Sequence, residues 1–157
     1  KLNFASFSDF AELESVLKNI FTDLKKGMNI IKPLPEVDVT LFLFIGKFED
    51  FKGEGVQADF FFHDAFSPEV NEELWTPEAF QKLKSLAKGE AILGTYCAAS
   101  KARAAMAVAG WKLAKARGAL GKREMTIASL SENNLTDFKR INEERLIERF
   151  NNGDFDH

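Results

Sequence analysis

Three short runs of apolar residues constrain the fold of this chain more than any other feature of its sequence. The runs are residues 37–45 (VDVTLFLFI), 58–63 (ADFFFH) and 91–97 (AILGTYC). They are largely apolar along their whole length rather than at every second position, which is typical of strands buried on both faces. Stretches with helical spacing occur between and around them. The sequence therefore predicts an α/β fold with a mostly parallel sheet covered by helices on both faces.

Turn and capping residues place the remaining elements. Further strands are expected at residues 2–6, 111–117 and 123–129, and helices at residues 9–27, 76–89, 98–109 and 136–150. Pro77 suits the first turn of the second helix, which Gly89 is expected to end, and Gly110 follows the third helix. GALGK joins the last two strands and predicts an antiparallel hairpin at the edge of the sheet. We expect an α/β domain over residues 1–129 and a charged helical tail over residues 130–157.

Composition limits the classes of function. With 157 residues and 45% hydrophobic content, the chain suits a single domain with one core. A net charge of −3 argues against general binding of polyanions but leaves room for a local basic patch that faces RNA. The single cysteine, Cys97, excludes an internal disulfide and a multi-cysteine metal site. No apolar run is long enough for a membrane span and no leader opens the chain, so we expect a cytoplasmic protein with no membrane partner and no metal.

Asp64 is the strongest candidate for chemistry on the residues alone. It directly follows the run 58–63, and in open α/β sheets ligands bind beyond the carboxyl ends of the strands. Asp64 is therefore placed to meet a ligand, although it could instead cap the turn formed by residues 66–68, as aspartate often does. His63 is expected to point away from Asp64 and to be buried with a satisfied ring, because side chains alternate along a strand. Cys97 is expected to be a small buried residue and not a nucleophile.

Four separated pieces, DAFSP, LWTP, TYCAA and KREM, occur in an order and at distances shared with one known family. They resemble the methyltransferase domain of the tRNA 5-methylaminomethyl-2-thiouridine enzymes, most specifically over residues 59–128. The resemblance implies a Rossmann-like class I methyltransferase fold, S-adenosyl-L-methionine as cofactor, and methylation of the aminomethyl group on the wobble uridine of tRNA. It also implies that the first strand and its glycine-rich turn are missing here. A preceding segment or a second copy in a homo-oligomer would then complete the sheet.

The resemblance also assigns site residues. As the catalytic residue, Asp64 would receive the incoming ammonium group and accept its proton. The positions that match cofactor contacts are Ser8, Asp9, Gly46, Lys47, Asp64 and Ala65, and those that match substrate contacts are Phe66, Ser67, Pro68, Trp75, Tyr96, Arg103, Lys122 and Arg123. Two positions depart from the family. Ser8 stands where a glutamate would bind the ribose, with Asp9 next to it. Lys47 stands where an aspartate would accept the adenine amine, and a lysine offers donors only.

Several substrate positions have a structural alternative. Trp75 would stack on a base or anchor the helix that follows it, and Tyr96 would donate to a ligand or belong to the core. Arg103, Lys122 and Arg123 would form a basic surface toward RNA or an ordinary solvated face. Two functions therefore stay open. One is a tRNA methyltransferase. The other, which the two departures favour, is a non-catalytic binding or scaffold protein that has lost cofactor binding.

Overall fold

The computed structural model describes residues 18, 20–32, 38–53, 55–118 and 124–156. The chain divides into two compact units, Lys1–Lys52 and Gly53–His157. The strand expected at residues 2–6 lies outside the described residues, as does about half of the helix expected at 9–27. Residues 18 and 20–22 of that helix are described and helical, but residues 23–26 are not helical and Gly27 begins a strand, so the expected end of the helix at Gly27 is wrong.

An antiparallel pair of strands forms the described part of the first unit. β1 (Gly27–Ile31) pairs with β2 (Leu41–Ile45), and a short 3-10 turn, Phe48–Asp50, follows. The expected strand at residues 37–45 is thus confirmed from Leu41 onward. It is not a buried strand of a parallel sheet, because Leu41, Phe42 and Ile45 are exposed. A two-stranded ribbon has no second layer of its own to cover apolar side chains.

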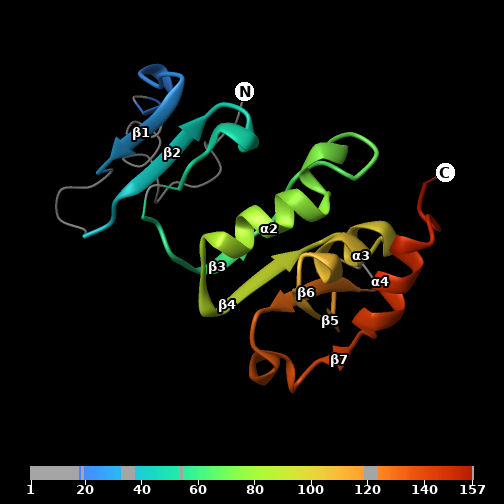
Figure 1. Ribbon diagram of the computed structural model, residues 1–157. Coiled ribbons are helices and arrows are strands. Elements are labelled where there is room, and N and C mark those ends of the chain that lie inside the picture. The colour runs from blue at the N-terminus through green and yellow to red at the C-terminus, as the bar shows by residue number, and fades with distance from the viewer. Residues whose placement is uncertain (1–17, 19, 33–37, 54, 119–123, 157) are drawn as a thin grey trace. The chain divides into compact units, whose positions relative to one another are not determined.

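The second unit contains a five-stranded sheet in the order β3-β4-β6-β5-β7 (Figure 1). Its strands are β3 (Ala58–Phe62), β4 (Ala87–Thr95), β5 (Lys112–Ala116), β6 (Met125–Ser129) and β7 (Lys139–Arg140). β3 and β4 pair in parallel, whereas β6 is antiparallel to both β4 and β5, and β7 is antiparallel to β5. β3, β4 and β5 therefore run in one direction. This mixed α/β sheet is consistent with the Rossmann-like fold that the sequence predicts.

The hairpin of β5 and β6 is confirmed, but its place in the sheet differs from the expected edge. β6 is inserted between β4 and β5, and β7, which the sequence does not indicate, forms the edge. Two residues of β6 have buried hydroxyl groups, and the hydrogen bonds of these groups suit an internal strand. Thr126 Oγ1 donates to the Cys97 carbonyl at 2.6 Å, and Ser129 Oγ donates to the Ala91 carbonyl at 2.9 Å. Alternation of apolar residues identifies a strand but does not reveal its neighbours.

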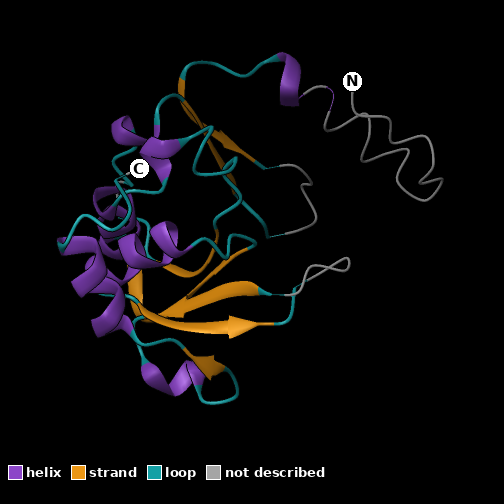
Figure 2. Cartoon of the chain, turned by 90° about the vertical axis from the view of Figure 1, so that its right-hand side faces the viewer, coloured by secondary structure: helices purple, strands orange, loops and turns teal. Residues whose placement is uncertain are grey.

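Three helices, α2 (Pro77–Ser85), α3 (Ser100–Val108) and α4 (Glu143–Asn151), lie along one side of this sheet (Figure 2). Thr76 caps α2, since its Oγ1 accepts from the Ala79 N–H at 3.2 Å. Two expected boundaries are wrong. Gly89 lies inside β4 and does not end α2, and α4 begins at Glu143, not at 136, because residues 139–140 pair with β5. The largest fully buried side chains are Trp111, Phe80, Leu93, Met106, Leu113 and Leu135.

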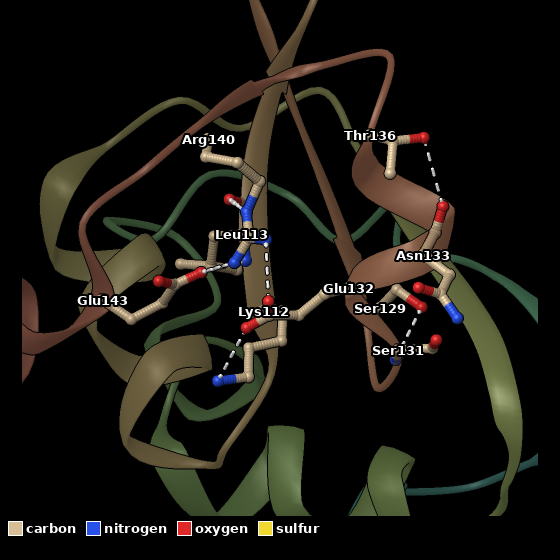
Figure 3. A network of polar contacts seen from close by, with 9 residues as sticks. All are labelled: Lys112, Leu113, Ser129, Ser131, Glu132, Asn133, Thr136, Arg140 and Glu143. Atoms are coloured by element: carbon tan, nitrogen blue, oxygen red, sulfur yellow. Dashed lines mark hydrogen bonds and ion pairs between the residues drawn. The ribbon is translucent and has the colours of Figure 1, made fainter.

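Polar contacts attach the C-terminal segment to β5 (Figure 3). Glu143 Oε1 accepts from the Leu113 N–H at 2.6 Å and from Arg140 Nη2 at 3.0 Å. Arg140 Nε in turn donates to the Leu113 carbonyl at 3.2 Å, and α4 contacts α3. Residues 130–156 thus contribute a strand and a helix to the second unit. The separation of a domain at residues 1–129 from a tail at 130–157 stays a prediction.

β3 is the edge strand opposite β7 in the described sheet. The His63 N–H donates to the Gly94 carbonyl at 2.9 Å, so the backbone groups of Phe62 point away from β4. The Phe62 side chain is 86% exposed, and Phe60 is exposed as well. β3 is therefore not the fully buried strand that its apolar run predicts, because it is paired along one edge only. That a further segment or a second copy of the chain completes this edge stays a prediction.

Candidate functional site

Asp64 lies just beyond β3, at the carboxyl end of the strand, with an exposed side chain. β4 runs parallel to β3, so Tyr96, which directly follows β4, reaches the same edge of the sheet. Burial raises the pKa of the Tyr96 phenol, and the nearby charge of Asp64 adds to this effect. Asp64 and Tyr96 therefore follow neighbouring parallel strands, at the edge where ligands bind in open α/β sheets.

The backbone on both sides of Asp64 is held by hydrogen bonds. On one side the His63 N–H donates to the Gly94 carbonyl of β4 at 2.9 Å. On the other side Tyr96 Oη donates to the Ala65 carbonyl at 2.7 Å, and Trp75 Nε1 donates to the Phe66 carbonyl, also at 2.7 Å. Asp64 thus presents a solvated carboxylate from a fixed stretch of chain.

Residues 66–71 continue this fixed stretch as a turn. The Ser67 carbonyl accepts from the N–H groups of Val70 at 2.8 Å and Asn71 at 3.0 Å. The Ser67 side chain hydrogen-bonds the carboxylate of Glu69, which lowers the pKa of Glu69. Pro68 lies within the same turn. Phe66 is 73% exposed, so the chain presents an uncovered apolar side chain two residues after Asp64.

His63 is not arranged as a base for Asp64. Its ring packs edge-on against Trp75, with centroids 4.5 Å apart, and lies 5.2 Å from the ring of Phe80. Desolvation lowers the pKa of His63, although a hydrogen bond with the Leu74 backbone and the charge of Asp64 oppose this. His63 is thus only partly buried, not fully buried as expected, and its ring is not fully satisfied, because Nε2 has no hydrogen-bond partner in the described part of the chain.

Of the two alternatives for Trp75, base stacking and a structural anchor, the contacts of Trp75 in this structure favour the structural anchor. Only 3% of Trp75 is exposed, its Nε1 is used on the Phe66 carbonyl, and its ring packs between His63 and Tyr96. A base cannot stack on a face that other side chains already cover. The hydroxyl of Tyr96 is likewise already used, on the Ala65 carbonyl.

Arg103 does not form part of a surface that faces RNA, and this expectation is corrected. It is only 6% exposed, on the sheet-facing side of α3. Its Nη1 pairs with Glu124 Oε1 at 2.9 Å, and its Nε donates to Thr126 Oγ1 at 2.9 Å. Lys115 Nζ pairs with the other Glu124 oxygen at 3.0 Å. α3 is buried almost all round, so a charged residue on it needs an internal partner.

The other expected positions are divided between the two units. Gly46 and Lys47 belong to the first unit, whereas Asp64 and Ala65 belong to the second. Lys47 Nζ pairs with Glu49 Oε1 at 3.3 Å on the surface. The positions that lie outside the described residues are Ser8, Asp9, Lys122 and Arg123. Within the second unit, the structure places Asp64 and Ala65 directly after β3, and the rest of the expected cofactor set stays a prediction.

Two cavities lie elsewhere. One, of about 650 Å³, is bordered by Lys112, Glu132, Arg140 and the start of α4, and the register of β4, β6 and β5 places Lys112 toward the end of the sheet away from Asp64. Its cations already pair with its carboxylates, Lys112 with Glu132 at 3.3 Å and Arg140 with Glu143 at 3.0 Å. A second cavity, of about 430 Å³, lies in the first unit between residues 20 and 31. Asp64 borders neither.

None of the helices in the described part of the chain has the length and apolar character that crossing a membrane requires. Among the same residues, no group of three or more acidic, histidine or cysteine side chains is placed to hold a metal ion. Cys97 is buried and free of disulfides, as the sequence predicts.

Comparison with protein families gives one match over most of the chain. Residues 9–131 match the model of a family described as S-adenosyl-L-methionine-dependent methyltransferase. This span includes both β3 with Asp64 and the strands β4 to β6.

Comparison with individual proteins gives partial matches. The chain is 41% identical over 92 residues to the tRNA 5-methylaminomethyl-2-thiouridine biosynthesis bifunctional protein MnmC of Ralstonia nicotianae, a match that covers 58% of this chain and 14% of that protein. It is 36% identical over 125 residues to the protein of the same name from Cupriavidus metallidurans, covering 79% of this chain and 18% of the relative. The solved structure of MNMC2 from Aquifex aeolicus is 27% identical, with 65% of this chain and 31% of that chain covered and a TM-score of 0.48. The chain thus spans less than a fifth of the length of these two curated relatives.

Proposed function

Because the chain belongs to the family of S-adenosyl-L-methionine-dependent methyltransferases, we propose that it methylates an amine on tRNA. The proposed substrate is the aminomethyl group of the modified wobble uridine, and the proposed product is 5-methylaminomethyl-2-thiouridine. The printed names of the two bacterial relatives support this choice of nucleoside. The observation that carries the proposal is the exposed Asp64 carboxylate at the carboxyl end of β3, on a backbone held on both sides.

Asp64 acts on the amine in this proposal. An aminomethyl group is an ammonium ion at neutral pH, and it has no lone pair for attack on a methyl group until it loses a proton. The Asp64 carboxylate attracts the ammonium ion, orients it and accepts that proton. The neutral amine then carries the lone pair that a bound methyl donor would need, so that a nitrogen–carbon bond could form as the donor's sulfur–methyl bond breaks. Phe66, exposed two residues further on, offers the uracil ring an apolar face beside the carboxylate.

S-adenosyl-L-methionine would supply the methyl group when bound, and the described residues fit it only in part. Asp64 suits the end where the amine and the methyl donor meet. At the adenine end, Lys47 has no acceptor for the amine of the base, and its ammonium pairs with Glu49. We therefore assign no contact to adenine or ribose, and the chemistry proposed for Asp64 involves the substrate amine alone.

The proposal is tested by incubating the purified chain with S-adenosyl-L-methionine and tRNA that carries 5-aminomethyl-2-thiouridine. The nucleosides are then separated and identified by mass spectrometry. We expect a nucleoside that has gained one methyl group, and none when the wobble uridine is unmodified. Methylation of the unmodified tRNA to the same extent would contradict the proposed amine substrate.

A second function is favoured by the first unit. β2 pairs antiparallel with β1, whereas the sequence predicts a parallel strand there, and Lys47 stands where the resemblance implies an acceptor, so the expected adenine contact is absent from the described residues of this unit. The chain would then bind or organise a partner without catalysis. Calorimetric titration with S-adenosyl-L-methionine distinguishes the two. Heat that saturates below millimolar ligand supports the enzyme, and no heat at millimolar ligand supports the non-catalytic alternative.

A further inference from the structure

Two side chains outside the Asp64 segment donate to consecutive carbonyl groups within it. Tyr96 comes from the end of β4 and holds the Ala65 carbonyl, and Trp75 comes from the start of the α2 region and holds the Phe66 carbonyl, each at 2.7 Å. The distance is at the short end of the usual range for the Trp75 N–H and typical for the Tyr96 O–H, and both donors are partly or fully shielded from water. These two bonds join the segment after Asp64 to two different elements of the fold.

The rings that carry these donors also pack on each other. Trp75 and Tyr96 lie edge to face, with centroids 6.4 Å apart, and Trp75 contacts His63 at 4.5 Å on the other side of Asp64. Phe80 of α2 lies against both Trp75 and His63. The residues before and after Asp64 are thus attached to one aromatic cluster. The side chain of Asp64 itself stays outside the cluster and in solvent.

We propose that Tyr96 and Trp75 are positioning residues that fix the Asp64 carboxylate by holding the carbonyl groups of Ala65 and Phe66. This inference rests on the role proposed above for Asp64. Neither side chain needs to touch the substrate, since each acts through the backbone. A carboxylate that must meet an ammonium ion in one geometry gains rate when its backbone is already in place. Loss of either bond should therefore lower the rate of methyl transfer more than the binding of tRNA.

The chain offers a matched control for Trp75. Trp111 is also buried, and its Nε1 also donates to the carbonyl of a phenylalanine, Phe80, at 3.1 Å. Trp111→Phe therefore removes an equivalent indole bond from the same unit, but not one that reaches residues 64–71. Tyr96→Phe removes a single oxygen atom and keeps the ring.

The first measurement is hydrogen–deuterium exchange of the full chain, followed by mass spectrometry. In Tyr96→Phe and in Trp75→Phe, we expect amides of residues 64–71 to exchange about five- to tenfold faster than in the wild type. In Trp111→Phe they should keep the wild-type rate relative to the rest of the second unit. Equal exchange of residues 64–71 in all three variants overturns the inference, whether or not the chain is an enzyme.

The second measurement is methyl transfer to tRNA. In Tyr96→Phe we expect kcat to fall about tenfold while KM for tRNA changes less than about threefold. Faster local exchange with an unchanged kcat would show that the carbonyls are held but that Asp64 does not depend on them, which overturns the positioning role. No methyl transfer by the wild type would instead contradict the proposed function, while the exchange result would still decide whether the two donors hold the segment.

Discussion

The ion pair between Arg103 and Glu124 gives a stability prediction that follows from burial. Arg103 is 6% exposed, whereas the Glu124 side chain is 35% exposed and also pairs with Lys115. Glu124→Gln leaves Arg103 buried without a counter-charge. Removal of one partner from a fully buried pair costs about 3–5 kcal/mol, and the partial exposure of Glu124 reduces this to about 2–3 kcal/mol. The folding equilibrium constant should therefore fall roughly 30- to 160-fold.

Two neighbouring variants provide the comparison. Lys115→Met should cost less than about 1 kcal/mol, because Lys115 is partly exposed and the ion pair between Arg103 and Glu124 remains in this variant. Arg103→Met should cost about 1–2 kcal/mol. Two hydrogen bonds of Arg103 are lost, but Glu124 still pairs with Lys115 and remains partly solvated. Glu124→Gln is thus expected to be the most damaging of the three, although it is the smallest change in shape.

Urea denaturation followed by tryptophan fluorescence measures these differences. The chain has two tryptophans, Trp75 and Trp111, and both lie in the second unit, so the signal reports the unit that contains the ion pair. The midpoint should shift while the slope stays constant, because the surface exposed on unfolding is unchanged. If Glu124→Gln loses no more stability than Lys115→Met, Arg103 does not depend on Glu124 for its burial and the reasoning is refuted.

The same pair predicts a pH dependence. Hydrogen bonds from Lys115 and Arg103 lower the pKa of Glu124 from its ordinary value of 4.5. A carboxyl group whose pKa is lower in the folded state stabilises that state above the unfolded pKa, and the effect is lost as the pH falls through the folded pKa. The gap in stability between the wild type and Glu124→Gln should therefore be full at pH 6 and above and should narrow below about pH 4.5. A gap that stays constant down to pH 3 would contradict this.

Three smaller predictions concern single residues of the second unit. Thr76→Ala should cost about 1 kcal/mol of folding stability by removing the cap of α2, whereas Thr136→Ala, at an exposed position, should change stability by less than about 0.5 kcal/mol. Equal losses of the two variants in urea denaturation would refute a stabilising role of the Thr76 cap. Gly110→Ala should cost about 1 kcal/mol because its φ is +86°, whereas Gly89→Ala, with no positive φ and no atom near the added carbon, should be close to neutral. Cys97 should react with an aromatic disulfide reagent only when urea unfolds the chain, and rapid reaction of the native protein would contradict its burial.

The pattern of apolar residues predicts the strands well but not their arrangement. The runs 58–63 and 91–97 form neighbouring parallel strands, as their composition indicates. The run 41–45 has the same composition but forms an antiparallel ribbon with exposed side chains, because composition does not specify the pairing partner. The sequence does not predict β7, because this strand consists of Lys139 and Arg140 and its pairing depends on contacts with β5.

The sequence likewise predicts some features of the candidate site but not others. The place of Asp64 at a strand end follows from the sequence, because the apolar run ends directly before it. The partners of Tyr96 and Trp75 do not, since both donate to carbonyl groups of residues many positions away. The sequence does carry a signal for Arg103: the residues that follow it in α3, from Ala104 to Val108, are all apolar, which indicates a largely buried helix in which an arginine needs a buried partner. Nothing in the spacing of residues identifies that partner as Glu124.

The central claim is that the carboxylate at the end of β3 receives and deprotonates the substrate amine. It is tested most directly by the rate of methyl transfer to tRNA in Asp64→Asn compared with Asp59→Asn. Asp59 is an exposed carboxylate at the other end of β3, where it pairs with Lys88 at 2.7 Å. We expect Asp64→Asn to lower kcat by about 100-fold or more and Asp59→Asn to change it less than about twofold. Retention of the wild-type rate by Asp64→Asn would contradict the claim, as would an equal loss in both variants.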